Sequence, residues 1–325
     1  MASPNIVFLH KLRQDLADKV LSACPPGLAT TAIHDQAPEQ EKRRALADAD
    51  FLIMYRARLD DGLMRAAGRL KLVQLLAAGY DNLNVGLLAR LGIACANNGG
   101  ANSWAVADQA VMMMLCIYRR GIQADSEVRQ GKWNAGVDGA NTFELAGKTV
   151  GILGLGNIGQ KVARRVQAFD AQVLYHNRTR LPAARERELG VAYAPLDELI
   201  AASDILSLHA PLTDDTRHLI GRDRLAAMKR GAVLINTSRG ALVDEAALAD
   251  ALREGRIAAA GLDAFESEPV DPANPLLALP NVMLSPHSGG TTADTWVRRG
   301  RFAYDNIARV LRGEPPLSPV REGAG

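Results

Sequence analysis

The spacing of three glycines after residue 153 constrains the fold of this chain more than any other sequence feature. Gly154, Gly156 and Gly159 follow the pattern GxGxxG, and they lie between the apolar run 149–153 and the amphipathic segment 158–169. The first glycine permits a tight turn, the second lets the backbone approach a pyrophosphate, and the third lets a helix pack closely on a strand. A plain strand-to-helix turn is the alternative, but this context predicts a dinucleotide-binding turn at a helix N-terminus.

Short apolar runs and amphipathic segments alternate along the chain, which is typical of a parallel sheet built from β-α-β units. In the first hundred residues the expected strands are 5–9, 30–33, 51–54, 72–75 and 93–96, with helices at 12–23, 39–47, 60–67 and 85–91. The second series has expected strands at 149–153, 172–175, 205–208, 232–236, 259–262 and 282–284, with helices at 158–169, 196–202, 222–228 and 244–254. Six strands with intervening helices match a full dinucleotide-binding sheet.

Two long helical segments, 103–129 and 293–312, bracket the second series. We therefore expect the second domain to be inserted into the first, whose chain returns through the C-terminal helix. The expected division is one domain made of residues 1–100 and 291–325 and a nucleotide-binding domain made of residues 101–290. The predicted fold class is α/β, with two doubly wound parallel sheets.

The charge balance of the chain is close to neutral, with 38 Lys and Arg against 36 Asp and Glu. No basic excess therefore points to nucleic acid or anionic lipid as a partner. The three cysteines form neither a CxxC pair nor a zinc-ligand pattern, which favours reduced thiols in an intracellular protein. The apolar run 6–9 is too short for a secretory signal, and the segment 106–118 is too short and too polar to span a bilayer. We expect a cytoplasmic protein without a metal site.

The end of the strand expected at 172–175 bears on the choice of cofactor. NAD-binding sites usually place an acidic residue there, where it accepts a hydrogen bond from the ribose 2′-hydroxyl. This chain has no carboxylate in that segment, because Asn177 stands at the expected position with Arg178 beside it. An arginine can contact the 2′-phosphate of NADPH through several charge-assisted hydrogen bonds. We predict a preference for NADP(H) over NAD(H); the other interpretation is that Arg178 and Arg180 belong to a solvated loop.

Three later segments each place an ionisable residue at the exit of an expected strand, where open α/β sheets build their sites. These residues are Arg239 after the strand 232–236, Glu268 in the loop after 259–262, and His287 after 282–284. Since the carboxyl ends of parallel strands meet at one edge of the sheet, we expect these three side chains to converge.

The chain resembles the D-isomer-specific 2-hydroxyacid dehydrogenase family, which includes glyoxylate/hydroxypyruvate reductases and glycerate dehydrogenases. The resemblance covers nearly the full length and rests on several motifs in the right order. Besides the glycine turn, these are Leu208-His209-Ala210-Pro211-Leu212-Thr213 with Thr216, Asn236-Thr237-Ser238-Arg239-Gly240, Asp263 through Pro269, and Ser285-Pro286-His287. The resemblance implies a Rossmann cofactor domain inserted into a flavodoxin-like substrate domain.

In this family the catalytic roles would fall on three matching residues. Arg239 would hold the substrate carboxylate and polarise its keto oxygen, which suits a planar guanidinium. His287 would protonate the developing alkoxide in reduction and act as the base in the reverse direction. Glu268 would orient the imidazole through its other ring nitrogen, and Asp263 would support the pair. Glu266 is the obvious decoy for Glu268.

The resemblance also implies binding residues for both ligands. The small residues Ala78 and Gly79, in the loop 75–82, would bind the substrate carboxylate through backbone N–H groups, together with Arg239 and His287. The implied cofactor contacts are Gly154, Gly156, Asn157, Ile158, Gly159, Asn177, Arg178, Thr179, His209, Ala210, Pro211, Thr216, Thr237, Ser238, Arg239, Asp263, His287 and Gly289. His209 is expected to be a neighbour of the cofactor rather than an acid.

The resemblance also implies an oligomeric state and a class of substrate, although the chain departs from the family pattern at Trp296. A homodimer is implied, supported by the long helix that begins near residue 103. Trp296 stands where hydroxypyruvate-reducing relatives often carry arginine, which leaves the preferred keto acid open between glyoxylate, hydroxypyruvate and a more apolar acid. Formate dehydrogenase chemistry is disfavoured, because it pairs the histidine with glutamine rather than glutamate. A cofactor-sensing protein without catalysis on the same scaffold is the non-enzymatic alternative.

Overall fold

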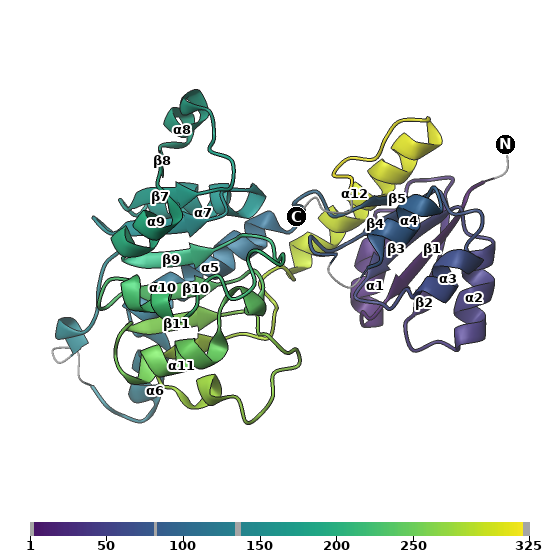
Figure 1. Ribbon diagram of the computed structural model, residues 1–325. Coiled ribbons are helices and arrows are strands. Elements are labelled where there is room, and N and C mark those ends of the chain that lie inside the picture. Colours follow the sequence, from purple (N-terminus) through teal and green to yellow (C-terminus); the bar gives the residue numbers. More distant parts are fainter. Residues whose placement is uncertain (1–2, 81–82, 134–137, 321–325) are drawn as a thin grey trace. The chain divides into compact units, whose positions relative to one another are not determined.

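The computed structural model describes residues 3–80, 83–133 and 138–320 of the chain, and two compact units make up the fold (Figure 1). The first, which we call the discontinuous unit, consists of residues 1–102 and 291–325. The second, the central unit, consists of residues 103–290. No helix in the described ranges is long and apolar enough to cross a membrane.

The discontinuous unit is built on a five-stranded parallel sheet in the order β2-β1-β3-β4-β5, the flavodoxin-like order. Its strands are β1 (Asn5–His10), β2 (Ala29–His34), β3 (Phe51–Tyr55), β4 (Leu72–Leu75) and β5 (Ala94–Ala96). Its helices are α1 (Gln14–Leu21), α2 (Glu39–Ala47), α3 (Asp61–Ala66), α4 (Val85–Arg90) and α12 (Ala293–Leu311). In Figure 1 the yellow helix α12 lies with the purple and blue N-terminal elements, and it packs on α1 and β4.

The two faces of this sheet carry separate apolar clusters, because successive side chains of a strand point to opposite faces. Ile6 and Phe8 of β1 belong to the cluster that includes Ile307 of α12. Val7 and Leu9 belong to the cluster on the other face, with residues of α2, α3 and α4. Burial on both faces explains why these strands are continuous apolar runs rather than alternating ones.

The central unit contains a seven-stranded parallel sheet in the order β12-β11-β10-β9-β6-β7-β8. Its strands are β6 (Thr149–Leu153), β7 (Gln172–His176), β8 (Ala192–Tyr193), β9 (Ile205–Leu208), β10 (Val233–Asn236), β11 (Ala259–Leu262) and β12 (Val282–Leu284). The helices are α5 (Ser103–Tyr118), α6 (Gly121–Arg129), α7 (Asn157–Gln167), α8 (Ala183–Leu189), α9 (Leu196–Ala202), α10 (Arg222–Ala227) and α11 (Glu245–Arg253), with short 3₁₀ turns at Asp138–Ala140, Gly240–Leu242 and Pro275–Ala278. This is the Rossmann order with one further strand, β12, at its edge.

Three local features differ from the sequence-based expectation. The first is helix α8, over a segment where no helix was expected. The sheet has a seventh strand, β8, which is only two residues long and therefore too short to stand out as an apolar run. The segment expected as one helix over 103–129 is two helices, α5 and α6, because Arg120 between them adopts a left-handed conformation with φ 50°. α5 is largely buried, whereas α6 has no buried residue among those described.

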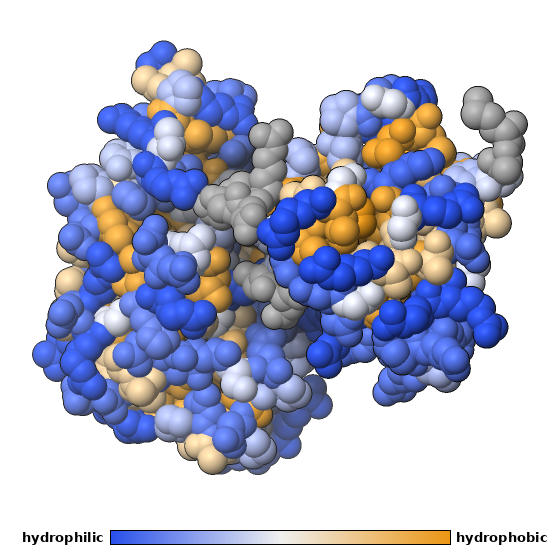
Figure 2. Space-filling view, turned by 45° about the vertical axis from the view of Figure 1, so that its right-hand side comes forward, coloured by the Kyte–Doolittle hydropathy of each residue, from blue (hydrophilic) through white to orange (hydrophobic). Residues whose placement is uncertain are grey.

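The surface of both units is mainly hydrophilic on the face drawn in Figure 2, and apolar residues are visible there in small groups. The apolar side chains of the central unit are instead collected in two clusters, one on each side of its sheet. Both faces of this sheet are therefore covered, as in other parallel sheets. Polar residues gather instead in the loops at the ends of its strands.

Candidate active site

The strand register of the central unit places its loop residues in one row at the carboxyl edge. Leu153, Leu208, Asn236, Leu262 and Leu284 are partners across five neighbouring strands. The residues that follow them are Gly154, His209, Thr237, Asp263 and Ser285. All of the motifs singled out in the central unit therefore start from the same edge, where open α/β sheets bind ligands.

The glycine turn between β6 and α7 fits only glycine at two of its positions. Gly154 has φ 97°, and a Cβ there would lie 2.7 Å from the backbone of His209. A Cβ on Gly159 would lie 2.3 Å from the carbonyl oxygen of Gly154. At Gly156, by contrast, no atom lies within 4 Å of the Cβ position, so the space beside this backbone is open. Close packing around an open central position is what a pyrophosphate cradle requires.

The surroundings of this turn suit a bound dinucleotide. Gly156 caps α7 without a side-chain hydrogen bond, and the first turn of α7 holds no acidic residue that would repel a phosphate. Among the described residues, the buried Oγ1 of Thr237 and Nδ1 of His209 have no hydrogen-bond partner. Such buried polar atoms are rare in folded proteins and are usually satisfied by water or a ligand. The residues present therefore fit a nicotinamide dinucleotide.

Asn177, next to the end of β7, binds the glycine turn itself. Its Oδ1 accepts a hydrogen bond from the backbone N–H of Leu155 at 2.6 Å. Arg178 and Thr179 follow on the exposed loop. Asn177 therefore holds the turn through a neutral group, where a carboxylate would add a negative charge.

Arg180 is tied into the central unit and is separate from the ribose-binding candidates. Its guanidinium contacts Glu186 through two hydrogen bonds of 2.8 and 2.9 Å. Glu186 also accepts a hydrogen bond from the Tyr175 hydroxyl at 2.7 Å. These contacts with Arg180 and Tyr175 lower the pKa of Glu186 to about 2. Arg180 thus has a structural role in the central unit, through Glu186.

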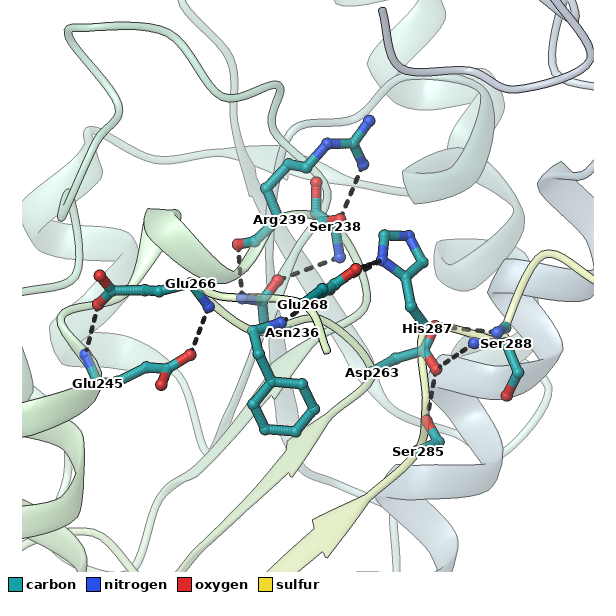
Figure 3. Close-up of polar contacts among 12 residues, drawn as sticks. Asn236, Ser238, Arg239, Glu245, Asp263, Glu266, Glu268, Ser285, His287 and Ser288 are labelled. Carbon is teal, nitrogen blue, oxygen red and sulfur yellow. Dashed lines mark hydrogen bonds and ion pairs between the residues drawn. The ribbon is translucent and has the colours of Figure 1, made fainter. Parts of the chain in front are cut away.

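His287 and Glu268 form a hydrogen-bonded pair (Figure 3). The Nδ1 atom of His287 lies 2.7 Å and 2.9 Å from the two carboxylate oxygens of Glu268. Glu268 also accepts a hydrogen bond from the backbone N–H of Phe265 at 3.0 Å, which fixes the carboxylate to its own loop. His287 has φ 51°, in the left-handed region. The pair leaves the Nε2 side of the imidazole as the side that can serve a reacting group.

Arg239 lies on a loop that is held against the loop of Glu268. The side chain of Asn236 bridges this turn, donating to the Arg239 carbonyl at 2.8 Å and accepting from the Ser238 N–H at 3.1 Å. At Gly240 a Cβ would lie only 1.8 Å from the carbonyl carbon of Phe265, so the two loops touch backbone to backbone. In Figure 3 the side chains of Arg239 and His287 project from these neighbouring loops.

Glu266 points to a different set of partners from Glu268. It accepts a hydrogen bond from the backbone N–H of Glu245 at 3.1 Å, and Glu245 accepts one from the N–H of Glu266 (Figure 3). Glu266 also forms an ion pair with His218 at 3.2 Å. The structure therefore places Glu268, and not Glu266, beside His287.

Asp263 is buried, with 2% of its surface exposed, and its carboxylate holds the turn around His287. It accepts hydrogen bonds from the backbone N–H groups of Ser288 and Gly289, each at 2.9 Å, and from the Ser285 hydroxyl. A Cβ on Gly289 would lie 2.7 Å from this carboxylate, so the turn can approach it only with glycine. Asp263 thus contacts the backbone on the C-terminal side of His287 rather than the imidazole.

The motif 208–216 packs beside the glycine turn. Burial lowers the pKa of His209 to about 4, so its ring is neutral near pH 7, and its Nε2 lies 2.8 Å from the Ser207 hydroxyl. Ser238 donates to the carbonyl of Ala210 at 2.6 Å, and Thr216 donates to the carbonyl of Pro211 at 2.8 Å. His209 is partly buried and its ring is neutral near pH 7, while its place beside the cofactor stays a prediction.

In the discontinuous unit, Ala78 and Gly79 follow β4 at the carboxyl edge of the sheet. The Ala78 carbonyl accepts a hydrogen bond from the Asn97 side chain at 3.1 Å, which fixes the start of this loop. Positions 81 and 82 of the expected loop lie outside the described residues. Trp296 is buried in this unit, edge-on to Tyr55 with ring centroids 5.0 Å apart.

Sequence reasoning did not assign a role to several residues that shape the site. Asn236, Gly240 and Ser285 were noticed only as parts of motifs, and Glu245 was not singled out. A glycine directly after Arg239 was a usable signal, because a close backbone approach commonly requires glycine. No local signal could have paired Glu245 with Glu266, since they are brought together only by the fold.

Comparisons with known proteins show which family the chain is similar to. Residues 111–289 match the family described as D-isomer specific 2-hydroxyacid dehydrogenase, NAD binding domain. A glyoxylate reductase of Aeropyrum pernix is 44% identical over 279 residues, which cover 84% of this chain and 83% of the relative. A glyoxylate/hydroxypyruvate reductase B of Pectobacterium carotovorum is 41% identical, with 83% and 85% covered. The crystal structure of a glyoxylate reductase from Paecilomyes thermophila superposes with a TM-score of 0.84 at 33% identity, covering 99% of each chain.

Proposed function

This chain belongs to the D-isomer-specific 2-hydroxyacid dehydrogenase family, and on that basis we propose that it is an NADPH-preferring reductase that converts small 2-keto acids to D-2-hydroxy acids. Glyoxylate and hydroxypyruvate are the first candidate substrates, since relatives bearing those names cover most of the chain. The observation that carries the proposal is the His287–Glu268 pair on a loop cluster that also bears Arg239. This arrangement supplies a proton donor and a carboxylate-binding cation together.

We propose that His287 is the general acid of the reduction. Glu268 accepts the hydrogen bond from Nδ1–H, and the imidazolium form of His287 transfers its Nε2 proton to the alkoxide oxygen as it forms. In the reverse direction the neutral Nε2 accepts the hydroxyl proton. Arg239 binds the substrate carboxylate and the keto oxygen through its paired donors. Nicotinamide, when bound, supplies the hydride.

The substrate carboxylate is proposed to bind the backbone N–H groups of Ala78 and Gly79 as well as Arg239. Ala78 carries only a methyl group and Gly79 none, so a ligand can approach their main chain. At position 296 this chain has a buried tryptophan, where hydroxypyruvate-reducing relatives often carry arginine. This change favours the smaller or more apolar acids, which makes a reductase of a more apolar 2-keto acid the second candidate.

The preference for NADPH is proposed from the loop after β7. Asn177 uses its amide oxygen to hold the glycine turn, and no carboxylate follows it on the exposed loop up to Arg180. Arg178, exposed and directly after Asn177, is the cation proposed to contact the 2′-phosphate. NADH is the alternative cofactor.

A homodimer is proposed from the apolar surface of the helical segment that begins the central unit. Large apolar side chains are exposed along it and just after it: Trp104 by 49%, Met112 by 37%, Ile122 by 61%, Val128 by 54% and Trp133 by 81%. Apolar surface of this kind is typical of protein–protein contacts. Analytical ultracentrifugation should show a dimer, and a concentration-independent monomer would contradict this assignment.

The activity test is the loss of NADPH absorbance with a panel of 2-keto acids. We expect turnover of glyoxylate or hydroxypyruvate, and we expect H287A to lower kcat by about two orders of magnitude with NADPH binding retained. H218A is a matched control, because His218 pairs with Glu266 outside the cluster of Arg239, Glu268 and His287. Near-normal turnover by H287A would refute the role of His287. Tight NADPH binding without oxidation by any acid would instead favour the cofactor-sensing alternative.

A further inference from the structure

The segment that carries His287 is held by a side chain from a distant helix, Gln109 of α5. The Nε2 atom of Gln109 donates a hydrogen bond to the Ser285 hydroxyl at 3.0 Å. A Cβ on Gly289 would lie 2.9 Å from Cγ and 3.1 Å from Cβ of Gln109. Gln109 therefore contacts the segment both before and after His287.

The donor in each of these hydrogen bonds is fixed by chemistry. An amide nitrogen can only donate, so the Ser285 oxygen accepts from Gln109 and must direct its single proton elsewhere. The proton is directed to Asp263, whose carboxylate can only accept. Gln109 thus selects the orientation of the Ser285 hydroxyl in which it binds Asp263.

Asp263 receives three hydrogen bonds from one short segment. The donors are the Ser285 hydroxyl and the backbone N–H groups of Ser288 and Gly289. His287 lies within this segment and has a left-handed backbone with φ 51°. A non-glycine residue in that conformation is strained and persists only when its surroundings determine it. The contacts on both sides of His287 supply that restraint.

We infer that Gln109 and Ser285 are positioning residues, which act through Asp263 to hold His287 in the orientation that meets Glu268 and the substrate. Neither side chain is assigned a direct contact with substrate or cofactor. The inference rests on the proposed function, because it assumes that His287 transfers the proton. Since a misplacement of about 1 Å can cost about a hundredfold in rate, loss of the restraint should appear mainly in kcat.

Two substitutions at Gln109 separate positioning from packing. Q109M keeps the unbranched side chain that contacts Gly289 but removes the donor, and we expect kcat to fall about tenfold. Q109E introduces an acceptor that competes with Asp263 for the single Ser285 proton. We expect a larger loss for Q109E that is partly reversed at low pH, where the introduced carboxyl group is protonated and can donate. A purely structural role for Gln109 would not give this pH-dependent recovery.

Matched variants complete the design. Q130M removes an equivalent hydrogen bond, from Gln130 Nε2 to the Ser126 hydroxyl at 3.1 Å, on the exposed end of α6, and it should leave kcat unchanged. S285A should lower kcat as Q109M does, S285T should restore it, and Q109M/S285A should be no worse than S285A alone. If a Gln109 variant fails to fold, the comparison of kcat between S285A and S285T still tests whether the hydroxyl at position 285 positions His287.

Turnover is measured together with the NADPH dissociation constant, and with the imidazole Nδ1 proton of His287 by NMR. Losses in kcat with unchanged NADPH binding and a shifted or exchange-broadened Nδ1 proton would support the inference. Unchanged kcat in Q109M and Q109E, or additive losses in the double variant, would overturn it. If the wild type has no reductase activity, the proposed function fails, and the Nδ1 signal alone then decides whether Gln109 positions His287.

Discussion

Gly240 offers a direct test of whether the loops of Arg239 and Glu268 must touch. A Cβ at this position would lie 1.8 Å from the carbonyl carbon and 2.2 Å from the carbonyl oxygen of Phe265, and 2.2 Å from the backbone nitrogen of Glu266. Ordinary contact begins near 3.4 Å, and the opposing atoms are backbone atoms that no side-chain rotation can move away. G240A should therefore displace one loop from the other by more than about 1 Å.

The consequence for activity can be estimated from this displacement. A shift of about 1 Å between groups that act on the same substrate costs about a hundredfold in rate, so we expect kcat of G240A to fall by about that factor. Overpacking should also lower the free energy of unfolding by about 1–3 kcal/mol. NADPH binding should also weaken, though by less, because the expected cofactor contacts Thr237, Ser238 and Arg239 lie on the displaced loop while the glycine turn after β6 does not.

The assay combines steady-state kinetics, NADPH titration and thermal unfolding. G68A is the matched control, since no atom lies within 4 Å of a Cβ at Gly68 and its φ is not in the left-handed region. We expect G68A to have wild-type kcat and equal or slightly higher stability. If G240A kept wild-type kcat and stability, the backbone contact would not be needed to align Arg239 with His287.

Two further predictions concern Arg178, in the loop after β7, and Glu186, in the helix α8 that follows it. R178L should raise KM for NADPH about tenfold and leave KM for NADH unchanged, which parallel titrations with both cofactors would measure; equal effects on both would contradict contact with the 2′-phosphate. Because the pKa of Glu186 is lowered from 4.5 to about 2, the unfolded chain takes up a proton first as pH falls. The stabilisation by Glu186 is thus present above pH 4.5 and lost between that pH and about 2. Urea unfolding of wild type and E186Q should show a stability difference at pH 7 that shrinks toward pH 3.

The carboxyl-edge row of the central unit could be predicted from sequence because parallel strands all end at one edge. Each apolar run predicted a strand, and the residue after it, such as Asp263 or Ser285, had to lie at that edge. What could not be predicted is what each side chain meets there. The bond from Gln109 to Ser285 joins residues 176 positions apart, and it depends on the rotation of α5 against the sheet. The strand β8 and the break at Arg120 were missed for a local reason, since neither has a strong apolar pattern.

The separate roles of Glu266 and Glu268 show how the fold resolves an ambiguity in sequence. Both residues lie in the same loop after β11, and the sequence alone does not show which of the two carboxylates binds His287. Glu266 is bound at the N-terminus of α11, where the N–H of Glu245 and the helix dipole favour a carboxylate, and His218 adds a second contact. Glu245 in turn binds the backbone N–H of Glu266 and so fixes this part of the loop. With Glu266 anchored on α11, Glu268 is the acid left to bind the Nδ1 atom of His287.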